Sequence, residues 1–70
     1  MKLAMYVYLA TIEEHGLNAA HELAQTHHPK VVLRKAEKAA DKGYVEYGTS
    51  PWYTWLTPKG REFLARERPC

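Results

Sequence analysis

Three cations in the middle of the chain have the type and spacing needed to bind a polyanion. Arg34, Lys38 and Lys42 follow one another at intervals of four residues, so on a helix they are neighbours in one row. Each like-charged pair costs an isolated helix roughly 0.2–0.5 kcal/mol unless a negative group lies against it. DNA phosphates are the commonest such group. Glu37 and Asp41 can offset part of the repulsion, so the alternative is a solvated basic face.

Positive charge is concentrated around this row. The net charge is only +2, but residues 30–42 carry five cations against two carboxylates. Residues 1–29 carry one cation against three carboxylates, and residues 59–70 carry four cations against two. This asymmetry favours an anionic partner for the middle and the end of the chain.

The four histidines do not have the spacing of a metal site. His21 comes six residues after His15, and the adjacent side chains of His27 and His28 point in different directions. Two ligands four residues apart on one helix face would be typical of a site, and that spacing is missing. We therefore expect surface and capping histidines, no bound metal and no cofactor.

No pattern typical of an enzyme is present. The single cysteine, Cys70, cannot form an internal disulfide and belongs to no nucleophile motif. Glu13 and Glu14 are adjacent, so their carboxylates diverge instead of forming a general acid and base pair. A phosphate-binding glycine loop and a nucleophile elbow are also missing. We expect a protein that is not an enzyme.

Hydrophobic spacing and turn residues predict the elements that position these side chains. The predicted helices span residues 2–15, 19–26, 29–42 and 58–67, and the predicted strands span residues 44–47 and 52–55. Asn18 is expected to cap the second helix, Pro29 to begin the third and Gly43 to end it. Thr57 and Pro58 have the pattern of a cap and a first helical residue.

The third predicted helix is amphipathic. At about 100° per residue its small and apolar side chains form one arc, namely Val32, Leu33, Ala36, Ala39 and Ala40. Its cations form a second arc, namely Arg34, Lys35, Lys38 and Lys42, with Val31 among them. The first arc predicts a core face that allows close approach by the first helix.

Aromatic residues are concentrated in the predicted hairpin. Alternation places Trp52, Thr54 and Leu56 on one face of the second strand, and Tyr53 and Trp55 on the other. One face must cover the helices, and the other exposes aromatic surface that is typical of a protein interface. The predicted interface residues are Tyr47, Trp52, Tyr53 and Trp55. The alternative is a hairpin that wraps its aromatics onto the core.

The length of 70 residues predicts a single domain over residues 1–70. A chain of this size buries only about 60% of the surface of its unfolded state, so every large apolar residue matters. Its apolar stretches are far shorter than the ~20 residues of a membrane span, and the N-terminal segment becomes acidic where a signal peptide has small residues. We expect a protein of the cytoplasm with no membrane contact.

Three stretches resemble the winged helix-turn-helix superfamily, in particular small bacterial and phage regulators of the MarR and PadR type. They are "HELA" on the second helix, "KAADKGYVEY" at the end of the third, and "WLTPKGREFL" after the hairpin. In such proteins a Leu-Ala step packs the second helix on the third, and Leu-Thr-x-x-Gly begins the helix after the wing. The resemblance covers residues 19–64 and implies three helices, a two-stranded wing and a C-terminal helix.

The resemblance also implies a docking mode in which the third helix enters the major groove of double-stranded DNA. Its first residues would then reach bases or phosphates, Val31 a thymine methyl group, and later lysines the backbone. The wing tip would add hydroxyl contacts to phosphate. The predicted DNA-binding residues are His28, Lys30, Val31, Arg34, Lys35, Lys38, Thr49 and Ser50.

These observations predict a small DNA-binding transcription regulator, such as a repressor from a phage or mobile element. A lone module offers few phosphate contacts, so we expect a homodimer that matches a two-fold operator. The alternative is a winged-helix module that binds or inhibits a protein partner through its aromatic hairpin.

Overall fold

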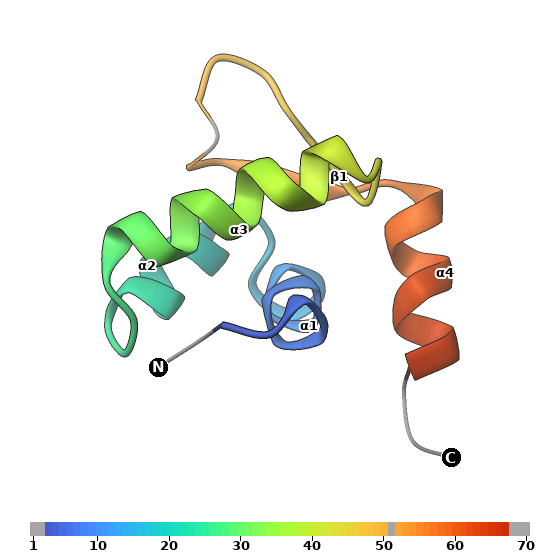
Figure 1. The fold of residues 1–70 in the computed structure, drawn as a ribbon, viewed down its shortest axis with the longest axis horizontal. Helices are drawn as coiled ribbons and strands as arrows, with labels where there is room; N and C mark the ends of the chain where they lie inside the picture. The colour runs from blue at the N-terminus through green and yellow to red at the C-terminus, as the bar shows by residue number, and fades with distance from the viewer. Residues whose placement is uncertain (1–2, 51, 68–70) are drawn as a thin grey trace.

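The computed structural model describes residues 3–50 and 52–67, and about two thirds of these residues lie in helices (Figure 1). The elements in chain order are α1 (Met5–His15), a short 3-10 helix η1 (Gly16–Asn18), α2 (Ala19–Ala24), α3 (Pro29–Asp41), β1 (Val45–Tyr47), β2 (Thr54–Leu56) and α4 (Pro58–Glu67). The mainly helical α+β class and the predicted element order are confirmed. Among the described helices, none has both the length and the apolar character that a membrane span requires.

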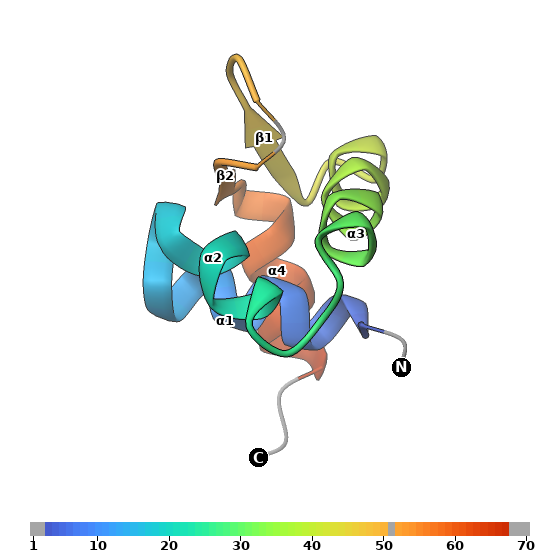
Figure 2. The same cartoon turned by 90° about the vertical axis from the view of Figure 1, so that its left-hand side faces the viewer.

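Helix α1 lies at the centre of the fold and packs against α2, α3, α4 and β2. It buries Tyr8, Leu9 and Ile12, each at most 3% exposed. The other elements complete the core with Leu23, Val32, Val45 and Leu64. Figure 2 shows the result, a group of helices with α3 along one side and the hairpin projecting beside it.

Helix α3 buries three residues of the predicted core arc, whereas Leu33 and Ala40 are half-buried. Val32, Ala36 and Ala39 are almost fully buried, and their small size lets the helix approach its neighbours closely. Pro29 is the first helical residue, as predicted, because its missing N–H needs no partner there. Gly43 follows the helix with a φ of +80°, a conformation that favours glycine and ends the helix.

The cap predicted for the second helix is wrong. Asn18 precedes α2, but its side chain makes no capping hydrogen bond. Its backbone, at φ −88° and ψ 0°, belongs to η1. A capping side chain needs an extended backbone at its own position, and the 3-10 turn removes it.

The strands are shorter than predicted, with three residues each, and β2 begins two residues later and ends one residue later than the predicted 52–55. The antiparallel register pairs Val45 with Leu56, Glu46 with Trp55, and Tyr47 with Thr54. The predicted alternation is confirmed, since Thr54 is buried while Tyr53 and Trp55 are nearly half exposed. The connection between the strands is correspondingly long.

The start of α4 is fixed to the end of α3 by a compact joint. The Thr57 hydroxyl donates to the Gly43 carbonyl and accepts the Gly60 N–H at 3.1 Å, and the Thr57 N–H donates to the Tyr44 carbonyl at 3.0 Å. A Cβ on Gly60 would overlap that Tyr44 carbonyl oxygen. The pattern Thr-Pro-Lys-Gly therefore caps the helix and permits close backbone contact.

Candidate nucleic-acid interface

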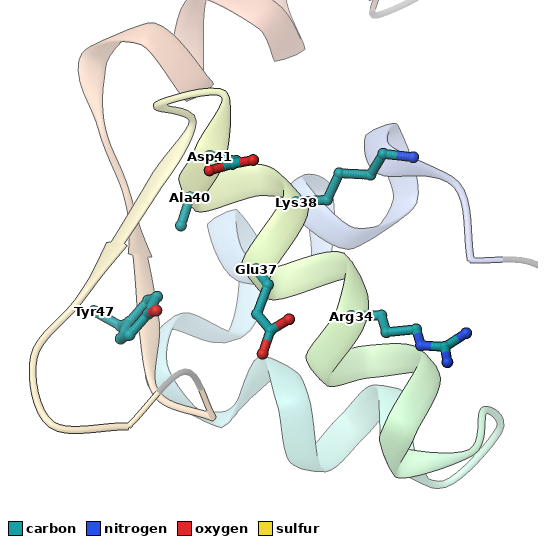
Figure 3. A pocket seen from close by; sticks show the side chains of 6 residues that line it. All are labelled: Arg34, Glu37, Lys38, Ala40, Asp41 and Tyr47. Atoms are coloured by element: carbon teal, nitrogen blue, oxygen red, sulfur yellow. The ribbon is translucent and has the colours of Figure 1, made fainter.

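The basic row, which we define as Arg34, Lys38 and Lys42, lies on the solvent-facing side of α3, and all three side chains are exposed. Figure 3 shows the Arg34 and Lys38 side chains extending away from the hairpin and away from the Glu37 carboxylate. The three-residue spacing of Arg34 and Glu37 thus does not bring their charged groups together. The row presents its charge to solvent.

The other edge of the exposed face of α3 carries two carboxylates, Glu37 and Asp41. Between the helix and the hairpin lies an open hollow of about 550 Å³, lined by Arg34, Glu37, Lys38, Ala40, Asp41 and Tyr47. We call it the hairpin-side hollow. Figure 3 shows Glu37 and Tyr47 on this side of the helix, with Asp41 one turn further along. A DNA backbone laid directly between α3 and the hairpin would meet both carboxylates, so the arrangement favours approach from the opposite edge.

The N-terminus of α3 carries two of the predicted DNA-binding residues, His28 and Lys30. The Nδ1 atom of His28 accepts the backbone N–H of Lys30 at 3.1 Å and caps the helix. Because Nδ1 is an acceptor, the proton of the neutral imidazole lies on Nε2, which makes that atom a donor. His28 and Lys30 are both exposed. This end of the helix therefore offers hydrogen-bond donors, and guanine edges and phosphate oxygens are hydrogen-bond acceptors.

Two other predicted residues of α3 lie away from the exposed edge. Val31 is half-buried and packs against the core. Lys35 is also half-buried and lies toward α1 and α4. The helical wheel placed both with the cations. However, α3 packs against different elements along its length, and a wheel contains no information about those neighbours.

The loop residues Thr49 and Ser50 have different roles. The Ser50 hydroxyl accepts the Trp52 N–H at 3.2 Å, and the Ser50 carbonyl accepts the Tyr53 N–H at 3.1 Å. Ser50 thus shapes the loop that returns the chain to β2. Thr49 is exposed at the end of the hairpin.

The aromatic residues predicted as one interface occupy three places. Trp52 is half-buried and donates its Nε1–H to Nε2 of His21 on α2 at 3.0 Å, with Tyr53 tilted against the same imidazole. Trp55 faces outward beside Glu46, its partner across the strands. Tyr47 faces the hairpin-side hollow. Alternation predicted the faces of Thr54 and Trp55 correctly, but Trp52 and Tyr53, which it placed on opposite faces, precede β2 and both contact His21.

A buried polar pair links α1 to the hairpin and was not predicted. The hydroxyl groups of Tyr8 and Thr54 lie 2.9 Å apart and share a hydrogen bond. Burial raises the pKa of the Tyr8 phenol above its ordinary value, and the hydrogen bond to Thr54 opposes this in part. A polar residue on the inward face of an apolar strand, as Thr54 is, was the signal that such a partner exists.

Within the described residues, histidine, cysteine and carboxylate side chains form no cluster that could hold a metal ion. Cys70 lies outside the described residues. Comparison of the chain with protein-family models, with curated proteins and with solved structures gives no match. Function must therefore be inferred from the chain itself.

Proposed function

We propose that the protein is a winged-helix DNA-binding regulator of the cytoplasm that places the N-terminal half of α3 in a major groove. The observation that carries this proposal is the basic row: its three side chains are exposed, and those of Arg34 and Lys38 extend from α3 without turning to Glu37. A row of like charges on a small domain is an unfavourable arrangement until a polyanion lies against it.

The exposed edges of α3 determine the proposed orientation of the duplex. His28, Lys30 and Arg34 occupy the first turns of the helix and supply donors to base edges. Lys38 lies one turn beyond Arg34 and holds a phosphate. Glu37 and Asp41 keep the phosphates on the edge of α3 opposite the hairpin, so the hairpin adds at most a contact from Thr49.

A homodimer completes the proposal. One module offers only a few phosphate contacts, and two modules on a two-fold operator double them while fixing the spacing of the half-sites. The operator is then a palindrome whose half-sites lie about one helical turn apart, a distance of roughly 34–36 Å.

The test compares DNA binding of the wild type and Arg34→Ala/Lys38→Ala on mixed-sequence duplexes. We expect wild-type affinity to fall by roughly 10–100-fold between about 50 and 200 mM salt, because bound phosphates release counterions. The double variant should bind roughly tenfold more weakly and show a shallower salt dependence.

The matched control is Arg61→Ala/Arg66→Ala, which removes two exposed charges from α4 and leaves α3 intact. It should bind DNA nearly as the wild type does. An equal loss in both double variants would indicate a general effect of net charge, and absence of binding at low salt would overturn the proposal.

A second function is favoured by one specific observation, the exposure of Tyr53 and Trp55. These side chains are 46% and 45% exposed, and aromatic residues are enriched at protein interfaces. If the chain is a protein-binding module or inhibitor, Tyr53→Ala and Trp55→Ala should each weaken binding of the partner protein. Arg34→Ala/Lys38→Ala should bind that partner as the wild type does. The reverse pattern would exclude this function.

A further inference from the structure

A second groove lies on the side of α3 that faces away from the hairpin. It runs between the start of α1, the helix α3 and the helix α4, has a volume of about 310 Å³, and is lined by Met5, Lys35, Lys38, Lys42, Tyr44 and Phe63. We call it the lysine groove. The rings of Tyr44 and Phe63 pack with centroids 4.8 Å apart and, with Met5, give the groove an apolar floor. All three are half-buried, so part of this apolar surface contacts solvent.

The charge along the lysine groove has a single sign. Lys35, Lys38 and Lys42 form one edge, and no carboxylate is among the lining residues. A fourth cation, Lys59, lies over the Tyr44 ring with its Nζ 5.9 Å from the centroid. The groove therefore combines an apolar floor with a rim of ammonium groups.

We propose that the lysine groove binds an acidic amphipathic helix of a partner protein. The lysines are separated by three and four residues, so they follow one line along α3 for about 10 Å, close to two helical turns. A helix lying along α3 with carboxylates at the same spacing meets all three, and its apolar side chains meet Met5, Tyr44 and Phe63. This is the geometry of helix-in-groove recognition with flanking charge pairs.

The apolar floor is what distinguishes this partner from DNA. A phosphate backbone satisfies the lysines but has no apolar surface to cover the exposed parts of the two rings and Met5. Methionine adapts its shape to different partners, which suits a peptide-binding surface. An acidic helix with bulky apolar residues satisfies both halves of the groove.

One consequence rests on the proposed function. Lys38 and Lys42 belong both to the basic row and to the lysine groove, and Lys38 also lines the hairpin-side hollow. DNA and an acidic helix that both contact Lys38 cannot occupy α3 together. The partner would thus displace the protein from its operator.

The test selects peptides from a displayed library of random 16-residue sequences against the folded protein. We expect the selected peptides to carry a net negative charge and bulky apolar residues at helical spacing. A synthetic peptide of the most enriched sequence should bind Met5→Gln/Lys35→Gln about tenfold more weakly than the wild type, because both the apolar floor and the rim are reduced.

Two control variants separate this groove from the DNA surface. Met5→Leu keeps the apolar floor and should bind the peptide as the wild type does. Arg34→Ala lies outside the lysine groove and should weaken DNA binding without changing peptide binding. Circular dichroism of each variant checks that the helices are retained.

Selected peptides without an acidic bias, or equal binding by Met5→Gln/Lys35→Gln, would overturn the inference and leave the proposed DNA binding standing. If the wild type binds the acidic peptide, if Met5→Gln/Lys35→Gln weakens that binding, and if the wild type fails to bind duplex DNA, the inference is supported and the proposed function is overturned. Displacement of a labelled duplex by the peptide would support both.

Discussion

The two sides of α3 differ in charge and in what surrounds them. Toward the hairpin, two carboxylates (Glu37 and Asp41) and two cations (Arg34 and Lys38) line a polar hollow with Tyr47, whereas toward α1 and α4 only lysines surround an apolar floor. Lys38 lies between the two. One short helix can therefore present two different surfaces, and its total charge does not describe either of them.

The difference arises from the neighbours of α3 as much as from its own residues. Among its described residues the hairpin supplies Tyr47 alone to its side, while α1 supplies Met5, the segment after α3 supplies Tyr44, and α4 supplies Phe63 to the other. Substitutions that displace these neighbours should therefore abolish the difference between the two sides of α3. Substitutions on α3 itself should change the binding properties of one side at a time.

The largest effect is expected from Gly60→Ala, because the added methyl group would overlap the Tyr44 carbonyl oxygen and push α4 away from the groove. We expect a loss of about 3 kcal/mol in the free energy of unfolding, the upper range for overpacking against rigid atoms. Urea denaturation measures it. Gly48→Ala is the matched control, since its new methyl group meets no atom within 4 Å. Equal stability of the two variants would contradict the close contact.

The hairpin side should depend on the hydrogen bond between Tyr8 and Thr54. Tyr8→Phe leaves the buried Thr54 hydroxyl without this partner, which should cost about 1–2 kcal/mol in the free energy of unfolding. Tyr8→Phe/Thr54→Val removes both polar groups and should recover part of that loss. Two losses that simply add would show that the hydroxyl groups do not interact.

The same pair predicts a loss of stability at alkaline pH. The pKa of the Tyr8 phenol is raised in the folded protein from 10.0, mainly by burial. Above pH 10 the unfolded state therefore binds fewer protons than the folded state, and stability falls as the pH rises. Urea denaturation between about pH 9 and about pH 11 should show a steeper decline for the wild type than for Tyr8→Phe. Parallel declines would mean that other groups cause the effect.

The sequence predicted the local features of the fold and missed the long-range ones. Pro29, Gly43 and Thr57 placed the ends of helices correctly because each acts on the backbone of its immediate neighbours. The bond between Tyr8 and Thr54 joins residues 46 positions apart, and no local pattern encodes such a distance. Asn18 failed as a cap because a 3-10 turn, which depends on how α1 and α2 pack, took its position.

The candidate site was predicted in the same uneven way. Spacing placed Arg34, Lys38 and Lys42 in one exposed row, and the structure retains that row. Spacing also grouped Lys35 and Val31 with it, although both are half-buried against other elements. A wheel assigns angles about one axis, whereas the boundary between a surface and a groove depends on where the neighbouring elements end.

The smallest effects are expected from two single substitutions at adjacent positions, Lys38→Gln and Glu37→Gln. They also give the most direct comparison of the two sides of α3. Lys38→Gln removes a cation from the basic row and should weaken DNA binding roughly fivefold, the loss of about one phosphate contact. Glu37→Gln removes a carboxylate from the hairpin-side hollow and should strengthen binding by a smaller factor, because the nearby phosphates meet less repulsion. Fluorescence anisotropy with one duplex at one salt concentration measures both. Equal weakening by the two variants would mean that DNA contacts the hairpin side of α3 as closely as the opposite edge, since the Glu37 carboxylate would then accept a hydrogen bond from a base instead of repelling the phosphates.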